Sequence, residues 1–420
     1  MQPSTIALLI ALAVIVLFIT EWLPVAVTAI LSAIAMAVAG IIPFNSALSG
    51  LGNNVVLFVF GMSVIGAAMF ETGGAQYVGQ LLSQRFKGNE RSFLLLMIVC
   101  AAVFSAFLSN TAVIVLFMNI VSSVAARSEG KITKKNTYMA IGIATIAGGA
   151  ATLVGSTSQM AAQGILLNHG AEGMGLFSLS APGIPVILAL VLYYRFYGYR
   201  KGLEIFDFPE RQEGISSLEE TPQAGVKMWL PVGILLICIV LISADIFPSG
   251  AIAVIGACVC VITGCISQKR MFESVDWTTI FVIAGSLGFA EGIDKSGAGT
   301  LAAEGLMRLL GSNVHPWVLF AVLVALATVM TNLMTNLSTV AIMLPIALSA
   351  AQSKGLDPMP FAVGIAWASN MPYSTPIGAN PITMTMTAGY RFRDYLKIGL
   401  PFNLIAYFLV VTIIPLVFPL

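Results

Sequence analysis

The chain has 420 residues, of which 58% are hydrophobic and only 9% are charged, and its formal net charge is +1. Soluble domains carry about 25% charged residues, so this composition excludes an ordinary soluble protein. Uncharged runs of about 17–20 residues recur along the chain, which is the length of a helix that crosses a hydrocarbon core. The sequence therefore predicts an all-α, multi-pass protein of the cell inner (plasma) membrane. It has no polybasic run that would indicate a nucleic-acid partner.

The apolar segments give the predicted elements in chain order. The first half, residues 1–199, contains spans at 5–20, 24–42 and 54–71, a hairpin at 92–126, a broken span at 137–168 and a span at 181–199. A polar linker at 200–227 follows. The second half, residues 228–420, contains spans at 228–244, 249–267 and 277–293, a hairpin at 317–351, a broken span at 359–388 and a span at 397–418. Two amphipathic stretches, 74–87 and 296–311, are expected to lie along the membrane interface.

Each hairpin joins two apolar segments through a short polar tip. The tips are Ser109-Asn110-Thr111 and Thr335-Asn336-Leu337, and neither has the Gly, Pro or charged residues of an aqueous loop. We expect both hairpins to be re-entrant, so that they dip into the membrane and return. Ten true spans then remain; two ordinary helix pairs are the alternative.

Positive charge fixes the predicted orientation. With the N-terminus outside, all but three of the 20 Lys and Arg residues fall on the cytoplasmic side; the exceptions are Lys295, Arg308 and Lys354. Loops rich in Lys and Arg stay in the cytoplasm. The sequence therefore predicts that both termini lie outside and that the linker 200–227 lies inside.

The two halves resemble each other at a spacing of about 223–226 residues. Pro24 corresponds to Pro248, Gly40 to Gly264 and Asn110 to Asn336. Each half holds five spans, an odd number, so the second copy must be inserted upside down. Inverted repeats of this kind are typical of secondary transporters, whose two copies meet around a site near the membrane midplane.

The two broken spans carry the residues best suited to chemistry. Each is roughly 30 residues long and has Gly or Pro beside hydroxyl side chains at its middle: Gly155-Ser156-Thr157-Ser158-Gln159 in one, and Ser374 to Pro381 in the other. A break frees backbone groups, which is tolerated in a membrane only where they line a cavity. Freed N–H groups at a helix N-terminus attract an anion, and carbonyl, hydroxyl and amide oxygens suit Na⁺. Hydrogen bonding between packed helices is the alternative role for these polar residues.

At these motifs the sequence resembles the divalent anion:sodium symporter family, the INDY-type carriers of solute carrier family 13, within the ion transporter superfamily. The resemblance rests on the Ser-Asn-Thr tip at 109–111, the second tip motif at 331–336, the Gly155-Ser156 break, Ser374-Thr375-Pro376 and the run from Gly389 to Pro401.

The resemblance implies a dimeric elevator carrier, in which a scaffold of about 1–90 and 228–315 forms a homodimer and the remaining helices move as a transport domain. It implies that the substrate contacts Asn110, Thr111, Ser156, Asn336, Thr375 and Pro376. It also implies that one Na⁺ is held by Ser109, Asn110 and Gly155, and a second by Thr331, Met334, Asn336 and Ser374. Two departures, Leu337 where the family usually has Thr and Gln159 where it usually has Asn, bear on the anion and on the second cation site.

We therefore expect a secondary active transporter of small divalent organic anions, such as succinate and other di- or tricarboxylates, that works by Na⁺-coupled symport or by exchange. An inorganic anion carrier, for sulfate for example, is an alternative, because dipole-lined breaks suit any small dianion. A cation/proton antiporter is another, which buried acids at the breaks would favour; the acids fall at predicted span ends instead. An enzyme or an ATP-driven pump is not expected, since the sequence has no metalloprotease, serine hydrolase or Walker motif.

Overall fold

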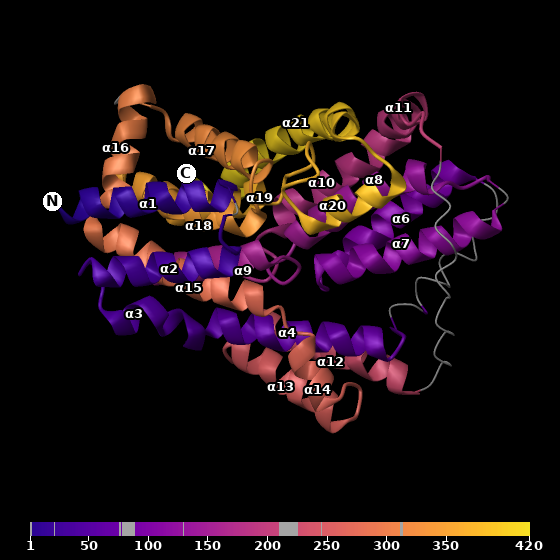
Figure 1. Ribbon diagram of the computed structural model, residues 1–420, viewed down its shortest axis with the longest axis horizontal. Helices are drawn as coiled ribbons and strands as arrows, with labels where there is room; N and C mark the ends of the chain where they lie inside the picture. Colours follow the sequence, from indigo (N-terminus) through magenta and orange to yellow (C-terminus); the bar gives the residue numbers. More distant parts are fainter. Residues whose placement is uncertain are drawn as a thin grey trace.

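The computed structural model describes residues 2–20, 22–74, 77, 89–128, 130–209, 226–244, 246–310 and 314–420. These residues form helices and no strands (Figure 1). The all-α prediction is confirmed for them. The predicted amphipathic stretch 74–87 and the linker 200–227 lie largely outside the described residues.

The helices of the first half follow the predicted segments. They are α1 (Pro3–Thr20), α2 (Val25–Val38), α3 (Phe44–Ser49), the 3-10 turn η1 (Gly50–Gly52), α4 (Asn54–Glu71), α6 (Glu90–Ser105), α7 (Asn110–Arg127), α8 (Lys134–Ala150), α9 (Thr157–Asn168), α10 (Ser180–Tyr193), the π-turn η2 (Tyr194–Gly198) and α11 (Tyr199–Ile205). The chain leaves the helical path between α6 and α7 and between α8 and α9, where the sequence places the first tip and the first break.

The second half has the same order of helices. They are α12 (Val226–Ser243), α13 (Ser249–Ile262), α14 (Gln268–Glu273), α15 (Trp277–Ser296), α16 (Ala298–Leu310), α17 (Pro316–Thr331), α18 (Asn336–Ser353), α19 (Pro358–Ser369), α20 (Asn380–Thr385), the 3-10 turn η3 (Met386–Ala388) and α21 (Phe392–Val417). The second tip lies between α17 and α18, and the second break lies between α19 and α20.

Glycines end equivalent helices of the two halves in the same way. Gly40 after α2 and Gly264 after α13 have φ of +72° and +70°. Gly73 after α4 and Gly297 after α15 have φ of +79° and +72°. A left-handed residue after a helix favours glycine, because any Cβ would be strained there. The spacing seen in the sequence thus reflects a repeated backbone turn.

Contacts between helices also occur in pairs across the two halves. α2 packs on α15, and α4 packs on α13. α1 packs on α2 as α12 packs on α13, while α6 and α7 pack on α8 as α17 and α18 pack on α19. Equivalent helices therefore make equivalent contacts, as two copies of one structural unit would.

The helices form two groups (Figure 1). The first group, α1–α4 with α12–α16, and the second group, α6–α11 with α17–α21, each pack mainly within themselves. Between the groups, α9 packs on α15 and α4, and α18 packs on α15, α16 and α1. Glycines permit this close approach: Gly164 of α9 faces the side chain of Leu287, and Gly299 of α16 faces that of Ser349.

Several helices are long and apolar enough to cross a membrane. By length and composition, five helical runs in the described residues qualify: Pro3–Thr20, Phe44–Glu71, Ser180–Ile205, Asn336–Ser353 and Phe392–Val417. Five shorter apolar helices accompany them. Most of α18 is buried inside the protein, whereas only 17% of α1 is buried. The number of true spans stays a prediction.

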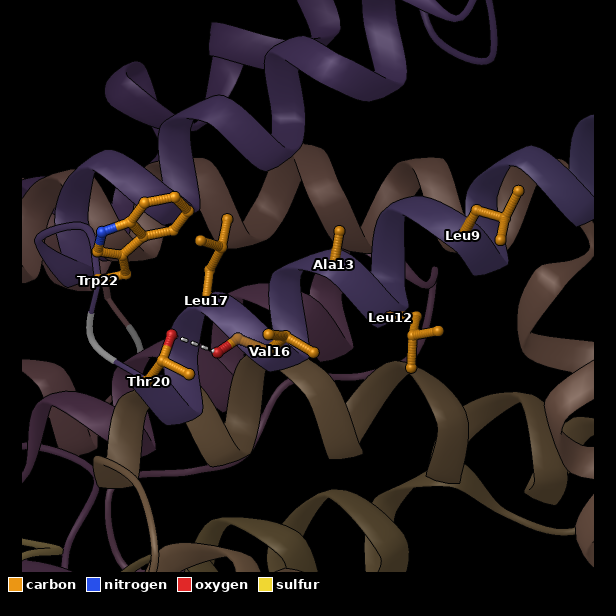
Figure 2. A pocket seen from close by; sticks show the side chains of 7 residues that line it. All are labelled: Leu9, Leu12, Ala13, Val16, Leu17, Thr20 and Trp22. Carbon is orange, nitrogen blue, oxygen red and sulfur yellow. Dashed lines mark hydrogen bonds between the residues drawn. The ribbon is translucent and has the colours of Figure 1, made fainter.

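The outward face of α1 is apolar and exposed. Figure 2 shows Leu9, Leu12, Val16 and Trp22 along this face, and Trp22 at its end is 83% exposed. An exposed apolar helix face is stable against lipid or against another protein. This face therefore marks a boundary of the chain toward lipid or another protein.

Candidate functional site

The first hairpin tip lies against the break in the first broken span. Ser105 Oγ donates to Asn110 Oδ1 at 2.6 Å. Gly149, near the end of α8, lies so close to the Asn110 amide that any side chain there would overlap it. Gly155 lies equally close to the carbonyl oxygens of Ser105 and Gly149. At Gly155 the close contacts are with backbone atoms, and at Gly149 they are with the Asn110 side chain, so a Cβ at either position would force its neighbour to shift.

Asn336 has the corresponding place at the second tip. One end of its amide lies 3.1 Å from Thr331 Oγ1, 2.9 Å from the Ser369 carbonyl oxygen and 3.0 Å from that of Gly378. The other end lies 3.2 Å from Asn370 Oδ1. Thr331 is the repeat equivalent of Ser105, so each tip pairs its Asn with a hydroxyl five residues earlier.

Threonine side chains hold each break to its tip. In the first half, Thr152 Oγ1 donates to the Ala106 carbonyl oxygen, and the Gly155 N–H donates to Thr152 Oγ1 at 3.2 Å. In the second half, Thr375 Oγ1 donates to the Asn332 carbonyl oxygen at 2.7 Å. The two breaks are thus held by equivalent bonds, which satisfy carbonyls that the tips free from helical pairing.

Asn370, at the end of α19, connects the two halves of the site. Ser156 Oγ donates to its Oδ1 at 2.9 Å, and its Nδ2 donates to Ser158 Oγ at 2.7 Å. The Asn336 amide contacts the same Oδ1. Asn370 and Ser158 are fully buried. A continuous hydrogen-bonded path therefore runs from the first break to the second tip.

Two helices begin at the site without a side-chain cap. Ser109 precedes α7 and Ser156 precedes α9, and neither hydroxyl accepts a hydrogen bond from the helix N–H groups. By contrast, Thr335 caps α18 through a bond from the Ser338 N–H at 3.2 Å. The first N–H groups of α7 and α9 are therefore left for other acceptors, with the positive ends of two helix dipoles behind them.

Three of the residues predicted to bind substrate lie in this hydrogen-bonded assembly: Asn110, Ser156 and Asn336. Thr111 is exposed on the first turn of α7. The buried Thr375 hydroxyl bonds to the second tip, and the carbonyl oxygen of the buried Pro376 accepts from Thr383.

Of the residues predicted to bind Na⁺, some lie in the hydrogen-bonded assembly and others lie outside it. Gly155 lies beside Ser105 near Asn110, and Thr331 contacts Asn336. Ser109 is exposed, while Met334 is buried in the hydrophobic core. Ser374 bonds elsewhere: its Oγ accepts from Asn403 at 3.0 Å, and its N–H donates to Asn332 at 3.2 Å.

The tips differ most at their third residue. Leu337 is 8% exposed and belongs to the hydrophobic core, whereas Thr111 at the equivalent position is exposed. The sequence predicted this chemical inequality, since Leu337 lacks a hydroxyl. The structure adds that the two positions also differ in burial.

Five residues of the assembly were missed in the sequence: Ser105, Gly149, Thr152, Ser369 and Asn370. Ser105 had a usable signal, because it precedes its tip by the same five residues as Thr331. Asn370 is an amide inside an apolar span, which is costly in a membrane unless it is paired. Gly149 and Ser369 contribute backbone carbonyl groups, which cannot be recognised from the type of side chain.

The family of the chain follows from a match over most of its length. Residues 15–366 match the family model of the citrate transporter, CitMHS. The chain belongs to the citrate transporter family. The predicted resemblance to the divalent anion:sodium symporter family, within the ion transporter superfamily, is thereby confirmed.

Curated relatives are transporters as well. The uncharacterized transporter YfbS of Escherichia coli (strain K12) is 31% identical over 189 residues, which are 44% of this chain and 30% of YfbS. The uncharacterized transporter sll0640 of Synechocystis is 28% identical, over 45% of this chain and 31% of that protein. The aligned part thus covers about a third of each of these relatives. The sodium-dependent dicarboxylate transporter SdcS of Staphylococcus aureus is 22% identical over 96% of this chain and 84% of its own.

Solved transporter structures share the fold. MtrF of Neisseria gonorrhoeae, described within a class of antimetabolite efflux pumps, has a TM-score of 0.64 at 11% identity and covers 99% of this chain and 94% of its own. The YdaH transporter of Alcanivorax borkumensis has a TM-score of 0.57 at 13% identity, over 90% of this chain and 87% of its own. The chain therefore has the fold of these proteins.

Proposed function

We propose that this protein is a secondary active transporter of small divalent organic anions, such as succinate and related di- or tricarboxylates, coupled to Na⁺ or working by exchange. The observation that carries this proposal is the joining of two tips and two breaks into one buried polar assembly. The family match and the sodium-dependent dicarboxylate transporter among the relatives support the same substrate class.

Substrate binding is proposed to use backbone dipoles and neutral side chains. Asn110 is the first residue of α7, and Ser156 immediately precedes α9. These are the two helices that begin at the site without a side-chain cap. Such N-termini attract anions. With Asn336 on the other side, two carboxylates could each meet amide and hydroxyl donors. Hydrogen bonds to a charged group contribute about 1.5–3 kcal/mol each, enough to hold a dianion without Lys or Arg.

The donor set at Asn336 fits a hard monovalent cation. When Nδ2 donates to Asn370, Oδ1 faces Thr331 Oγ1 and the carbonyl oxygens of Ser369 and Gly378, so four oxygens converge. Turned by 180°, Nδ2 would donate to these carbonyls instead. We propose that Na⁺ takes the first arrangement, and that Asn110 with Ser105, Gly149 and Gly155 forms the equivalent site. A bound cation would supply positive charge beside the anion.

The two helix groups support an elevator mechanism. The first group contains the predicted scaffold, and the second contains both hairpins and both broken spans. Contacts between the groups are concentrated on α9 and α18. We propose that the second group slides on the first, with the scaffold forming a homodimer and both termini outside, in the inner membrane.

Uptake of radiolabelled succinate, citrate and sulfate into proteoliposomes, with and without Na⁺, tests the proposal. We expect Na⁺-stimulated or exchange-driven uptake of a carboxylate. Asn110→Ala and Asn336→Ala should each abolish uptake while expression and oligomeric state are kept. If the two amides only joined packed helices, each change would have a mild effect, because a packing hydrogen bond in a bilayer contributes only about 0.6 kcal/mol. Sulfate uptake alone, or near-normal carboxylate uptake by both variants, would contradict the assignment.

A further inference from the structure

Three arginines gather at the predicted cytoplasmic end of the second group, away from the tips and breaks. They are Arg91 at the start of α6, Arg195 in the π-turn η2 and Arg200 in α11. Arg91 precedes the apolar segment 92–126. The pKa of its guanidinium is lowered, first by desolvation and then by the positive charges of Arg195 and Arg200. α6 packs on η2, and the Tyr199 hydroxyl at the start of α11 donates to Glu90 beside Arg91, so the three arginines lie on adjoining helix ends.

Glu90 builds a fixed junction beside this arginine cluster. Its Oε1 accepts from the Thr133 N–H and from the Thr133 hydroxyl, both at 2.7 Å. Its Oε2 accepts from Asn136 Nδ2 at 3.0 Å and from the Tyr199 hydroxyl at 2.8 Å. The carboxylate thereby ties together the starts of α6, α8 and α11. Its hydrogen-bonding capacity is taken up by neutral donors.

The arginine cluster has no anionic partner among the described residues. None of the ion pairs formed there includes Arg91, Arg195 or Arg200. The Nε of Arg91 is buried and makes no hydrogen bond. Three cations on adjoining helix ends, beside a carboxylate whose oxygens are occupied by neutral donors, define a site for an anion.

The surroundings of the arginine cluster are those of a membrane surface. Leu192, Phe196 and Leu203 are 56%, 65% and 55% exposed on the same helical run. The Arg195 guanidinium carbon lies 5.6 Å from the centre of the Phe196 ring. A soluble anion needs no apolar surface around it, whereas a phospholipid needs apolar surface for its acyl chains beside a cationic site for its phosphate.

We propose that Arg91, Arg195 and Arg200 bind the phosphate headgroup of an anionic phospholipid, whose acyl chains lie along Leu192 and Phe196. Basic pockets between membrane helices on the cytoplasmic side recognise such headgroups. The planar guanidinium forks match phosphate oxygens in pairs. This site does not depend on which substrate the protein transports.

The test is titration of the purified full-length protein, in a neutral detergent, with short-chain phosphatidylglycerol. Phosphatidylcholine of the same chain length and soluble glycerol phosphate serve as comparison probes. Arg195→Gln with Arg200→Gln should weaken phosphatidylglycerol binding about thirtyfold, given the contribution expected of each basic side chain near an anionic lipid surface. Arg195→Lys with Arg200→Lys should restore part of it.

The matched control removes two positive charges from the same predicted membrane face but from the first group: Lys227→Gln with Lys269→Gln, on α12 and α14 (Figure 1). This variant should bind phosphatidylglycerol like the wild type. Unchanged thermal midpoints in neutral detergent show that both double variants fold. Three results would each overturn the proposal: wild-type binding by the double Gln variant, an equal loss in the control, or equally tight binding of glycerol phosphate.

Discussion

Asn370 offers the sharpest test of whether the two halves of the site act together. Its amide contacts Ser156, Ser158 and Asn336, which come from the first break and the second tip. Asn370→Ala removes this link and leaves two buried hydroxyls with fewer partners. We expect carbonyl and amide oxygens at the second tip to lose their fixed positions as a result.

The expected size of the effect follows from these three contacts. Interhelical polar contacts in membrane proteins contribute about 0.6 kcal/mol each on average, so three of them sum to about 2 kcal/mol. If that energy fixes the bound geometry, its loss weakens ligand binding about thirtyfold. The half-saturating Na⁺ concentration for succinate uptake should rise by a similar factor, because Asn336 belongs to both the cation set and the Asn370 link.

Succinate uptake into proteoliposomes, measured over a range of Na⁺ concentrations, provides the readout. Asn54→Ala is the matched control: Asn54 also joins the halves, by bonds to the Ser249 hydroxyl at 3.2 Å and the Gly250 N–H at 2.9 Å, but within the first group. It should leave the Na⁺ dependence near wild type. A normal Na⁺ response in Asn370→Ala, or an equal shift in Asn54→Ala, would refute the reasoning.

Two further predictions concern packing and topology. Gly149→Ala should abolish uptake, because the added methyl group would overlap the Asn110 amide, whereas Gly52→Ala, where a Cβ would meet nothing within 4 Å, should transport normally; equal activity of both in the same uptake assay would contradict the close approach at the first tip. A single cysteine at Ser217, in the predicted linker and outside the described residues, should react with an impermeant thiol reagent only from the cytoplasmic side, and labelling of intact cells would reverse the predicted orientation.

The sequence predicted the positions of the tips and breaks because their signals are local. The Ser109-Asn110-Thr111 tip lies where α7 begins after α6, and the Gly155-Ser156 break lies between α8 and α9. A polar tip or a glycine within an apolar run marks where a helix must end. The all-α fold followed from composition in the same way.

The partners within the site could not be predicted, because they depend on tertiary contacts. Ser374 was grouped with Asn336 by resemblance, yet its side chain bonds to Asn403. In the sequence, Asn370 does not differ from other polar residues in apolar spans. Only its contacts with Ser156 and Ser158 show its role. Ligands that are backbone carbonyl groups, such as that of Ser369, cannot be predicted from residue type. They nevertheless contribute half of the oxygens that converge at Asn336.

The contacts between the two helix groups are not repeated in the two halves. α9 and α18 pack on the first group, whereas their repeat equivalents α20 and α7 pack mainly on α8 and on each other among the described residues. Because the two units share their other contacts, we infer that this difference belongs to one conformation of the chain rather than to the fold. The predicted topology places the loops after α9 and α18 outside, so these contacts between the groups involve helices that end on the predicted outer side. Exchange of the two arrangements would open the site to the opposite side of the membrane, and this is the change that an elevator carrier requires.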